Sequence, residues 1–458
     1  MKSLLFYTLL SLAFLSCSDN GSPYIGSGSD DNEFSVTGQW IADLETPSNI
    51  FYVRPVGSVY GSGDGSSWDN AFSGLPAVRQ RNSIYYFASG EYFDESLDRI
   101  ENYIFDDADA GEEFIFIVKA TLTDHGSDEG FEESFAEGSA NLGPLSFIGS
   151  RYVIDGNTPG GFVINHRNCD IRETDFVASP IFFPWNSVSE YLLIKNTEIY
   201  DCGHHTDPTV RSQDALYGVA GVKHFAFISN YIHDAWRNLF FLQDSYDLWI
   251  EGNHFERSGM HHEASTIALR NSRNIVIRRN MLTDTVNDFI SLQSVRNVVI
   301  SSNILQSTLE GWEIWSAIFS QEPAKNVLIA GNTFYKLAGL NTGIRFTDDT
   351  DDLRVINNIW ASNRTNQIML NGTHSSNAFY DNYRVDGANP VYLDDNIDED
   401  TKQVFTSDPF VSADTGDFCL TAPTDIAEET GSDFASVDYS GTPRGTDGNP
   451  DRGSCEYE

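Results

Sequence analysis

The sequence predicts an all-β fold, a right-handed parallel β-helix in which each coil consists of three short strands. The first observation is a sequence pattern that recurs between about residues 190 and 385: alternating apolar residues, one or two polar residues, an asparagine and another apolar pair. The asparagines are 23 to 34 residues apart, and a period in this range is typical of a solenoid. They are Asn196, Asn230, Asn253, Asn280, Asn303, Asn332, Asn358 and Asn382.

The second observation is the alternation of side chains inside each repeat. In the repeat that contains Asn303, apolar residues alternate within the stretches 290–292, 298–300 and 304–305. A period of two predicts strands, and three strands per turn without a helix between them predict a three-sided coil. The asparagine then falls at the tight turn between the second and third strands, where it tolerates a left-handed backbone and its amide can bond to the next coil.

Two further segments suggest caps at the ends of the solenoid. Strand-like stretches at 51–53 and 84–92 flank a Gly- and Ser-rich loop and look like the entry segment of many exported β-helix proteins, in which a strand and a short helix, here at about Asn70–Arg79, cover the open first coil. Near the C-terminus, 408–420 and 441–444 look like the closing segment of such proteins. Together with the repeats, these segments resemble the pectate-lyase-like superfamily of β-helix proteins. The expected division is 50–395 for the β-helix with its N-terminal cap and 396–458 for the closing segment, because a solenoid needs covered ends.

The N-terminus, 1–17, resembles a bacterial lipoprotein signal peptide. Lys2 precedes an apolar run that is too short to span a membrane, and Leu15-Ser16-Cys17 resembles a lipobox. Cys17 is therefore the expected lipidation site, followed by a flexible tether at 18–49; an ordinary signal peptide is the alternative. We expect an exported protein that is lipid-anchored to the outer membrane or cell surface of a Gram-negative bacterium, with no other membrane contact.

The charge excludes one class of partner. The chain has 67 acidic and 28 basic residues, which gives a net charge of −39. Nucleic-acid binding needs clustered Lys and Arg, so no nucleic-acid partner is expected. An acidic sugar polymer would need local arginines or bridging Ca²⁺. We expect the protein to be a monomer.

Cysteines 169, 202, 419 and 455 allow three pairings. The pairs Cys169–Cys202 and Cys419–Cys455 are favoured because each would link neighbouring coils or the terminal cap. Buried free thiols are the alternative.

In the superfamily that the chain resembles, polysaccharide lies along the first sheet, in a groove walled by the preceding loops. The inward pairs of that sheet are expected to be Tyr217/Val219, Phe240/Leu242, Ile267/Leu269, Ile290/Leu292, Ile318/Ser320, Ile344/Phe346 and Ile368/Leu370. The outward positions that follow would then form a polar ladder of Gln243, Arg270, Gln293 and Gln321, with about 4.8 Å between coils. Amide stacking alone would also explain such a ladder.

The loops that lead into these strands hold the other candidate residues. An exposed Trp beside Arg, His and carboxylate groups suits a sugar groove, because an aromatic ring stacks on a pyranose. The candidates are His204, His205, Trp236, Arg237, His261, His262, Glu263, Asp288, Trp312, Glu313 and Trp315.

No metal site is predicted from the histidines, since neither His204-His205 nor His261-His262-Glu263 has the spacing of a zinc signature. The acidic runs 348–352 and 394–396 could bind Ca²⁺ through oxygen ligands, although solvated turns explain them as well. No other cofactor is expected.

The leading hypothesis is a carbohydrate-active protein, a polysaccharide lyase that acts on a uronate-containing glycan. A lyase needs a cation for the uronate carboxylate, a base for the C5 proton and an acid for the leaving oxygen. Arg270 or Arg237 would be the cation and His261 or His262 the base, with Glu263 beside them. The substrate contacts would come from Gln243, Gln293, Gln321, Trp236, Trp312, Trp315 and Asp288.

Two alternatives remain open. A glycoside hydrolase would use paired carboxylates, drawn from Glu263, Asp288, Glu313 and Asp244. A non-catalytic surface protein that binds glycans or mediates adhesion would use the β-helix only as a scaffold.

Overall fold

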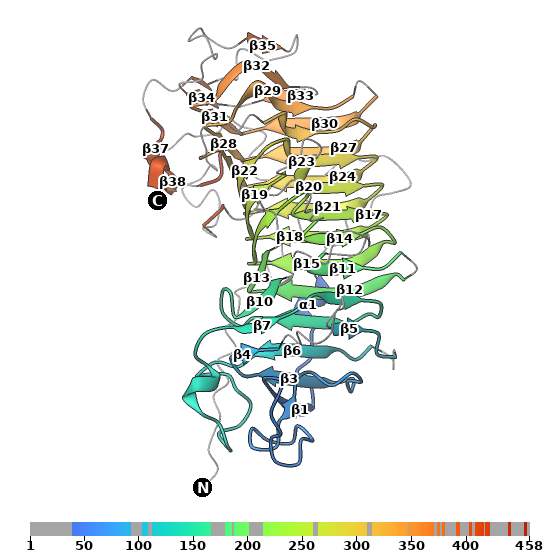
Figure 1. The fold of residues 1–458 in the computed structure, drawn as a ribbon. Coiled ribbons are helices and arrows are strands. Elements are labelled where there is room, and N and C mark those ends of the chain that lie inside the picture. Colours follow the sequence, from blue (N-terminus) through green and yellow to red (C-terminus); the bar gives the residue numbers. More distant parts are fainter. Residues whose placement is uncertain are drawn as a thin grey trace.

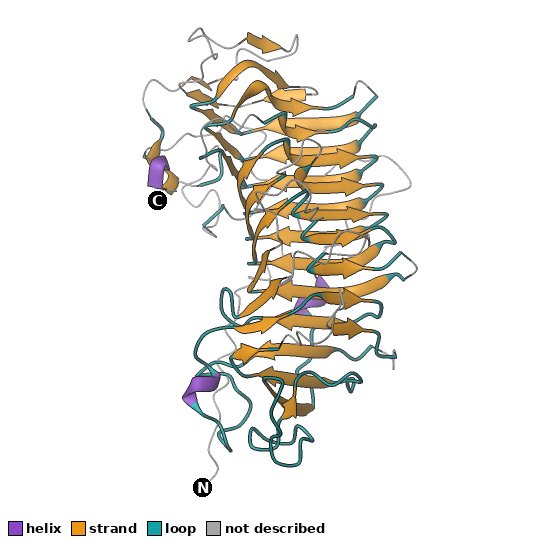
Figure 2. Ribbon diagram, viewed as in Figure 1, coloured by secondary structure: helices purple, strands orange, loops and turns teal. Residues whose placement is uncertain are grey.

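The computed structural model is a parallel β-helix whose three long sheets run along one axis (Figure 1). The structure describes 39–92, 103–108, 112–165, 179–185, 187–200, 214–259, 264–308, 314–347, 349–370, 373–375, 378–380, 391–393, 403–404, 408–415, 417–421, 438–440 and 453–455. Strands dominate these residues, and the helical segments are short (Figure 2). No helix in the described ranges has the length and apolar character needed to cross a membrane. The predicted all-β fold with three strands per coil is confirmed.

Each coil contributes one strand to each of three parallel sheets. The first sheet consists of β5 (Tyr103–Phe105), β8 (Leu145–Phe147), β11 (Ile181–Phe183), β14 (Leu216–Gly218), β17 (Phe240–Gln243), β20 (Ser265–Arg270), β23 (Asp288–Gln293), β26 (Ser316–Phe319), β29 (Ala338–Arg345), β32 (Arg364–Leu370) and β35 (Val391–Leu393). The second consists of β1 (Asn49–Arg54), β2 (Phe72–Ser73), β3 (Ser83–Phe87), β6 (Ile115–Lys119), β9 (Tyr152–Asp155), β12 (Ser189–Lys195), β15 (Val222–Ile228), β18 (Tyr246–Glu251), β21 (Arg273–Arg278), β24 (Arg296–Ser301), β27 (Lys325–Ala330), β30 (Asp351–Ile356) and β33 (Thr373–Ser375). The third consists of β4 (Gly90–Glu91), β7 (Ala140–Leu142), β10 (Phe162–Asn165), β13 (Thr197–Tyr200), β16 (Tyr231–Ala235), β19 (His254–Ser258), β22 (Met281–Thr285), β25 (Ile304–Gln306), β28 (Thr333–Tyr335), β31 (Ile359–Ala361), β34 (Ala378–Tyr380) and β36 (Gln403–Val404).

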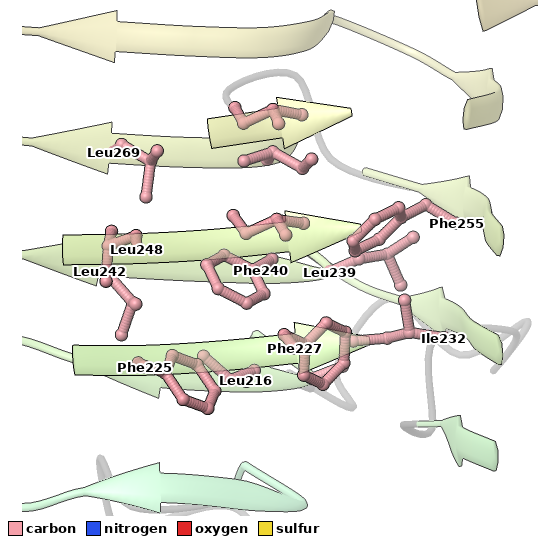
Figure 3. Packing of buried hydrophobic residues seen from close by; sticks show 14 of the residues in the cluster. Leu216, Phe225, Phe227, Ile232, Leu239, Phe240, Leu242, Leu248, Phe255 and Leu269 are labelled. Atoms are coloured by element: carbon pink, nitrogen blue, oxygen red, sulfur yellow. The ribbon is translucent and has the colours of Figure 1, made fainter. Parts of the chain in front are cut away.

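The core is a continuous column of apolar side chains inside the three sheets. Phe227 from the second sheet, Phe240 from the first and Phe255 from the third meet there, and all three are fully buried (Figure 3). Burying one such side chain contributes about 1.5–3 kcal/mol. Since every coil repeats this packing, the hydrophobic stabilisation is distributed along the whole solenoid.

The predicted asparagine ladder is present at the turn between the second and third sheets. The Asn280 Nδ2 group donates to Asn303 Oδ1 at 3.0 Å and to the Ile250 carbonyl at 2.9 Å. The same contacts repeat from coil to coil, from Asn230 to Asn358. The ladder therefore connects the coils at a position that is closed to water, because these side chains are buried.

Two details of the ladder differ from the prediction. The left-handed residue is the one before the asparagine, such as Arg279 with φ 57° and Ser302 with φ 54°. In addition, Asn196 has φ 58° and lies one residue before the ladder position. Thr197 occupies that position, and its hydroxyl and N–H donate to Asn230 Oδ1. The ladder residue is followed directly by the next strand, so the left-handed turn residue is the one before it. Asn382 lies outside the described residues.

The predicted helix at Asn70–Arg79 is wrong. Residues 72 and 73 form β2, which pairs with β1. Gly74 has φ 77°, and Pro76 follows two residues later. A left-handed glycine and a proline, which also restricts its preceding residue, interrupt a helix at this point.

Helix α1 (Gln39–Ala42) lies earlier in the chain than the predicted fold boundary at residue 50. Its Trp40 packs against Phe114, Tyr191 and the outward face of the second sheet. The flexible tether expected at 18–49 is therefore too long, because its last residues are part of the folded structure. Residues 1–17 and the rest of the tether lie outside the described residues.

The closing segment covers part of the third sheet. Strands β37 (Phe410–Ser412) and β38 (Asp417–Leu420) form an antiparallel hairpin, whose Phe410 and Phe418 pack on Tyr335. Strand β36 still pairs with β34, so the β-helix extends beyond the expected boundary at residue 395.

In the closing segment, Cys419 and Cys455 interact through a hydrogen bond and form no disulfide in the structure. Burial raises the pKa of the Cys419 thiol, and the hydrogen bond with Cys455 opposes this effect. The two cysteines of the favoured pair are thus neighbours. Cys169 and Cys202 lie outside the described residues.

Candidate functional site

The outward face of the first sheet carries the predicted polar ladder. Gln243 pairs in register with Arg270, and Arg270 pairs with Gln293. The Arg270 side chain is exposed, while the two glutamines are half-buried. Their order along three consecutive coils agrees with the alternation read from the sequence.

The alignment was wrong by one residue in β14. Leu216 pairs with Phe240 and Gly218 with Leu242, so Tyr217 faces outward opposite Phe241. A side chain at Gly218 would meet the core: a Cβ there would lie 2.9 Å from Leu242 Cδ2. The large neighbours of Gly218 therefore fix the register and place Tyr217, which was expected inside, on the candidate surface.

The alignment is also wrong in β32, by two residues. Ile344 pairs with Leu370, and Thr342 pairs with Ile368. Strand β29 is long and begins at Ala338, six residues before Ile344. Counting from the strand ends therefore does not show which residues of β29 pair with Ile368 and Leu370 of β32.

Aromatic rings form a row on the outward face. Tyr217 stacks between Phe182 and Phe241, with ring centroids 6.2 and 5.3 Å away. Phe182 and Phe241 are almost fully buried and Tyr217 is half-buried. Of these three rings, Tyr217 is the one that is accessible enough to contact a bound sugar.

Two arginines converge on this row. The Arg270 guanidinium lies over the Phe241 ring, 5.4 Å from its centroid. Burial and the charge of Asp214 raise the pKa of Tyr217, and the nearby charges of Arg237 and Arg270 oppose this rise. Both predicted cations therefore lie within electrostatic range of one phenol.

Neither arginine has a salt bridge among the described residues. A salt bridge to Asp288 would explain the Arg270 cation without a ligand, and the described residues do not contain one. Glu263, another carboxylate close to Arg270 in the sequence, lies outside the described residues.

Arg345 is a third cation on the first sheet and was missed from the sequence. Its guanidinium lies 5.7 Å from the centroid of Phe319, one coil away, and its charge influences Asp288. Because Ile344 and Phe346 face inward, alternation alone placed Arg345 outside and would have identified it.

A row of buried polar residues supports the starts of these strands. The N–H and Nδ2 groups of Asn238 donate to Asp214 Oδ1, and the Ser265 N–H donates to Asn238 Oδ1 at 2.8 Å. The Ser316 hydroxyl donates to Asp288 Oδ1 at 2.6 Å. Asp288 was expected to contact substrate, but its side chain is buried within this row.

Burial raises the pKa of Asp288 to about 7, although hydrogen bonds from Ser316 and the charge of Arg345 oppose the rise. A carboxyl group of the unfolded chain ionises near pH 4. Folding therefore favours the protonated form, so the stabilising contribution is complete below about pH 4 and is lost as the pH rises through about 7.

We expect Asp288→Asn to remove this pH dependence. Relative to the variant, the unchanged protein should lose stability between pH 4 and 8, by on the order of a few kcal/mol. Urea unfolding of both proteins at pH 5 and pH 8 measures this difference. A difference that is the same at both pH values would contradict the protonated state of Asp288.

Some of the remaining predicted site residues lie in the described part of the chain, and others do not. Gln243 Nε2 donates to Asp244 Oδ2 at 3.0 Å, and Gln321 is exposed just beyond β26. Trp236 is half-buried and Trp315 is 55% exposed. His204, His205, His261, His262, Glu263, Trp312 and Glu313 lie outside the described residues.

In the described part of the chain, no group of three or more His, Cys, Asp and Glu side chains is arranged to hold a metal ion. In the first acidic run considered for Ca²⁺, Asp349, Asp351 and Asp352 are exposed, and Asp352 pairs with Arg354 at 3.8 Å. Asp348 and 394–396 lie outside the described residues.

Comparison with known proteins gives one family and several distant structures. Pectate lyase Pel9A is 12% identical, with 90% of this chain and 97% of that chain covered and a TM-score of 0.48. DFA-IIIase from Arthrobacter chlorophenolicus A6 in complex with DFA-III is 10% identical, with 70% and 77% covered and a TM-score of 0.35. No curated protein matches the chain. The model of the family described as periplasmic copper-binding protein (NosD) matches residues 167–402, which is more than half of the 458 residues, and the chain therefore belongs to the NosD family.

Proposed function

We propose that the chain binds a uronate-containing polysaccharide along the outward face of the first sheet and cleaves it as a lyase. The observation that carries this proposal is the convergence of Arg237 and Arg270 on Tyr217, without a salt bridge among the described residues. In a chain with 67 acidic and 28 basic residues, carboxylates are abundant partners for any arginine. Two guanidinium groups that act on the same phenol and pair with none of the described carboxylates favour an anionic ligand.

The proposed reaction is a β-elimination. Arg270 and Arg237 pair with the uronate carboxylate and so acidify the C5 proton. His261 or His262, in the loop directly before β20, accepts this proton. The electrons of the C5–H bond form the C4–C5 double bond, while the bond between C4 and the glycosidic oxygen breaks.

Tyr217 is the proposed acid for the leaving oxygen. Burial, the largest influence, raises the pKa of its phenol, so the group keeps its proton at neutral pH. Its neighbours Arg237 and Arg270 would place the reacting sugar next to it. The groups named here all come from a single copy of the chain, so the proposed reaction requires no second copy.

Paired carboxylates receive less support. Asp288 begins β23, whereas Asp244 follows the end of β17, whose last residue Gln243 is in register with Gln293 at the other end of β23. Asp244, one residue beyond Gln243, is therefore six residues from Asp288 in register, which corresponds to roughly 20 Å along the strands at about 3.3 Å per residue. Glycoside hydrolases need about 5 to 9.5 Å between the two groups. Binding without cleavage remains the second candidate, since the same arginines would serve it.

A panel of polysaccharides tests the proposal. The purified chain is incubated with uronate polymers and neutral polymers, and the ultraviolet absorbance of the unsaturated product and the release of reducing ends are followed. We expect both signals from at least one uronate polymer and neither from neutral polymers. Reducing ends without absorbance would indicate hydrolysis, and saturable binding without either signal would indicate a binding protein.

Copper binding is named in the description of the family. The described residues do not fit a copper ion: His233 contacts Asp234 at 2.6 Å and Glu198 at 3.3 Å, and His224 contacts Asp247 at 3.0 Å. We therefore derive no copper chemistry for the chain.

Export with a lipid anchor on Cys17 is part of the proposal, and the family description, which names periplasmic proteins, supports export. We expect Cys17→Ser to move the protein from the membrane fraction to the soluble fraction, because the lipid is attached to the thiol. Fractionation of Gram-negative cells that express either form measures this change. Continued membrane association of the variant would contradict the assignment of Cys17.

A further inference from the structure

A pocket of about 370 Å³ lies where the segment after α1 crosses the second sheet. One wall is Trp40 of α1 with the residues that follow it, and the floor includes Phe114 and Tyr191 from the outward side of the second sheet. The candidate glycan site is on the first sheet, so this pocket is separate from it. Its volume is in the range of pockets that bind small molecules.

Aromatic rings shape the pocket. Trp40 lies parallel to Phe114, with ring centroids 6.0 Å apart, and Tyr191 meets Trp40 edge-on at 5.8 Å. The Arg151 guanidinium lies over the Tyr191 ring, 4.9 Å from its centroid. These rings pack against Val153 and Leu193, which hold α1 on the sheet. The pocket therefore has ordered apolar walls that can receive the carbon skeleton of a ligand.

The charge of the pocket is strongly negative. Asp43 and Glu45 line it from the N-terminal segment, and Glu112 and Glu113 line it from the loop before β6. Arg151 is the only basic residue among the residues that line it. Carboxylates that line one pocket repel one another, and a bound cation would relieve the repulsion.

We propose that this pocket binds a small organic cation, an ammonium group carried on a carbon skeleton, as in a polyamine or an amino sugar. The carboxylates attract the ammonium group, and the aromatic walls pack against the attached carbons. A bare metal ion fits less well, because no described group of three His, Cys, Asp or Glu side chains is arranged to hold one. An anionic glycan would be repelled.

Calorimetric titration of the full chain at physiological salt tests this proposal. Spermidine and glucosamine are the two probes, which distinguish a polyamine from an amino sugar, and glucose is the neutral control. We expect one-site binding of at least one amine and no binding of glucose. Absence of one-site binding for both amines, or equal binding of glucose, would overturn the proposal, as would many equivalent sites, which indicate diffuse attraction to the acidic chain.

A matched pair of variants locates the binding. We expect Glu112→Gln with Glu113→Gln to weaken amine binding at least about tenfold, which corresponds to roughly 1.4 kcal/mol. Glu132→Gln with Glu133→Gln removes the same charge from two adjacent exposed glutamates outside the pocket and should leave binding unchanged. Trp40→Leu should weaken binding as well, without changing the charge. Equal effects of the two glutamate pairs would place the binding elsewhere and overturn the proposal.

Discussion

Asn280→Leu should destabilise the β-helix by at least about 3 kcal/mol. The Asn280 side chain is fully buried, donates to the Ile250 carbonyl and to Asn303 Oδ1, and accepts from the Asn253 N–H and Nδ2. Leucine has the same branched arrangement of side-chain heavy atoms but satisfies none of these groups. Each buried polar group that is left without a partner costs about 1–3 kcal/mol. Urea unfolding of the purified chain measures the loss.

Gln306→Leu is the matched control. It also replaces an amide by leucine, but Gln306 is half-buried on the outward face of the third sheet, where water can replace its bond to Thr283 Oγ1. We expect a change within about 0.5 kcal/mol. If Asn280→Leu unfolds at the same urea concentration as Gln306→Leu, the ladder does not stabilise the coils as argued here.

Arg270→Ala should lower turnover of the uronate polymer found in the screen at least about a hundredfold, with the fold unchanged. Removing one group that neutralises charge in a transition state typically costs about 10²–10³ in rate. Arg270 is exposed, lies over the Phe241 ring and has no salt bridge to a described carboxylate, so the substitution leaves no described buried carboxylate unpaired. Steady-state kinetics and thermal unfolding of the variant measure the two effects.

Arg273→Ala is the control for this prediction. Arg273 is also exposed and lies over an aromatic ring, that of Tyr246 at 5.0 Å, but it belongs to the second sheet. The loss of a cation over an aromatic ring is therefore similar in both variants, and only the position differs. Equal turnover in the two variants would show that the first sheet is not the site.

The fold could be predicted because the same local signal is repeated in every coil. Each ladder asparagine marks one turn of the β-helix, so a repeat that is unclear in one coil can be recognised from the repeats on either side of it. The helix predicted at Asn70–Arg79 had no such repetition, and Gly74 with Pro76 decided the conformation there. Helix α1 could not be predicted for a related reason: four residues carry too little periodicity, and Trp40 is held by tertiary packing.

The candidate site could be predicted for Arg270, Gln243 and Gln293, because alternation within a strand determines which face a side chain takes. Tyr217 was misplaced because β14 has only three residues, and a one-residue shift reverses the faces. The collision that a side chain at Gly218 would have with Leu242 decides the register, and it is visible only when the coils are stacked. The burial of Asp288 likewise depends on neighbouring coils.

A crystal structure of the chain with a uronate oligosaccharide from the screen would show whether an anionic glycan binds along the outward face of the first sheet. We expect a sugar carboxylate within hydrogen-bonding distance of Arg270 or Arg237, and a sugar ring beside Tyr217. An oligosaccharide bound to the second or third sheet, with these three side chains uncontacted, would contradict this expectation.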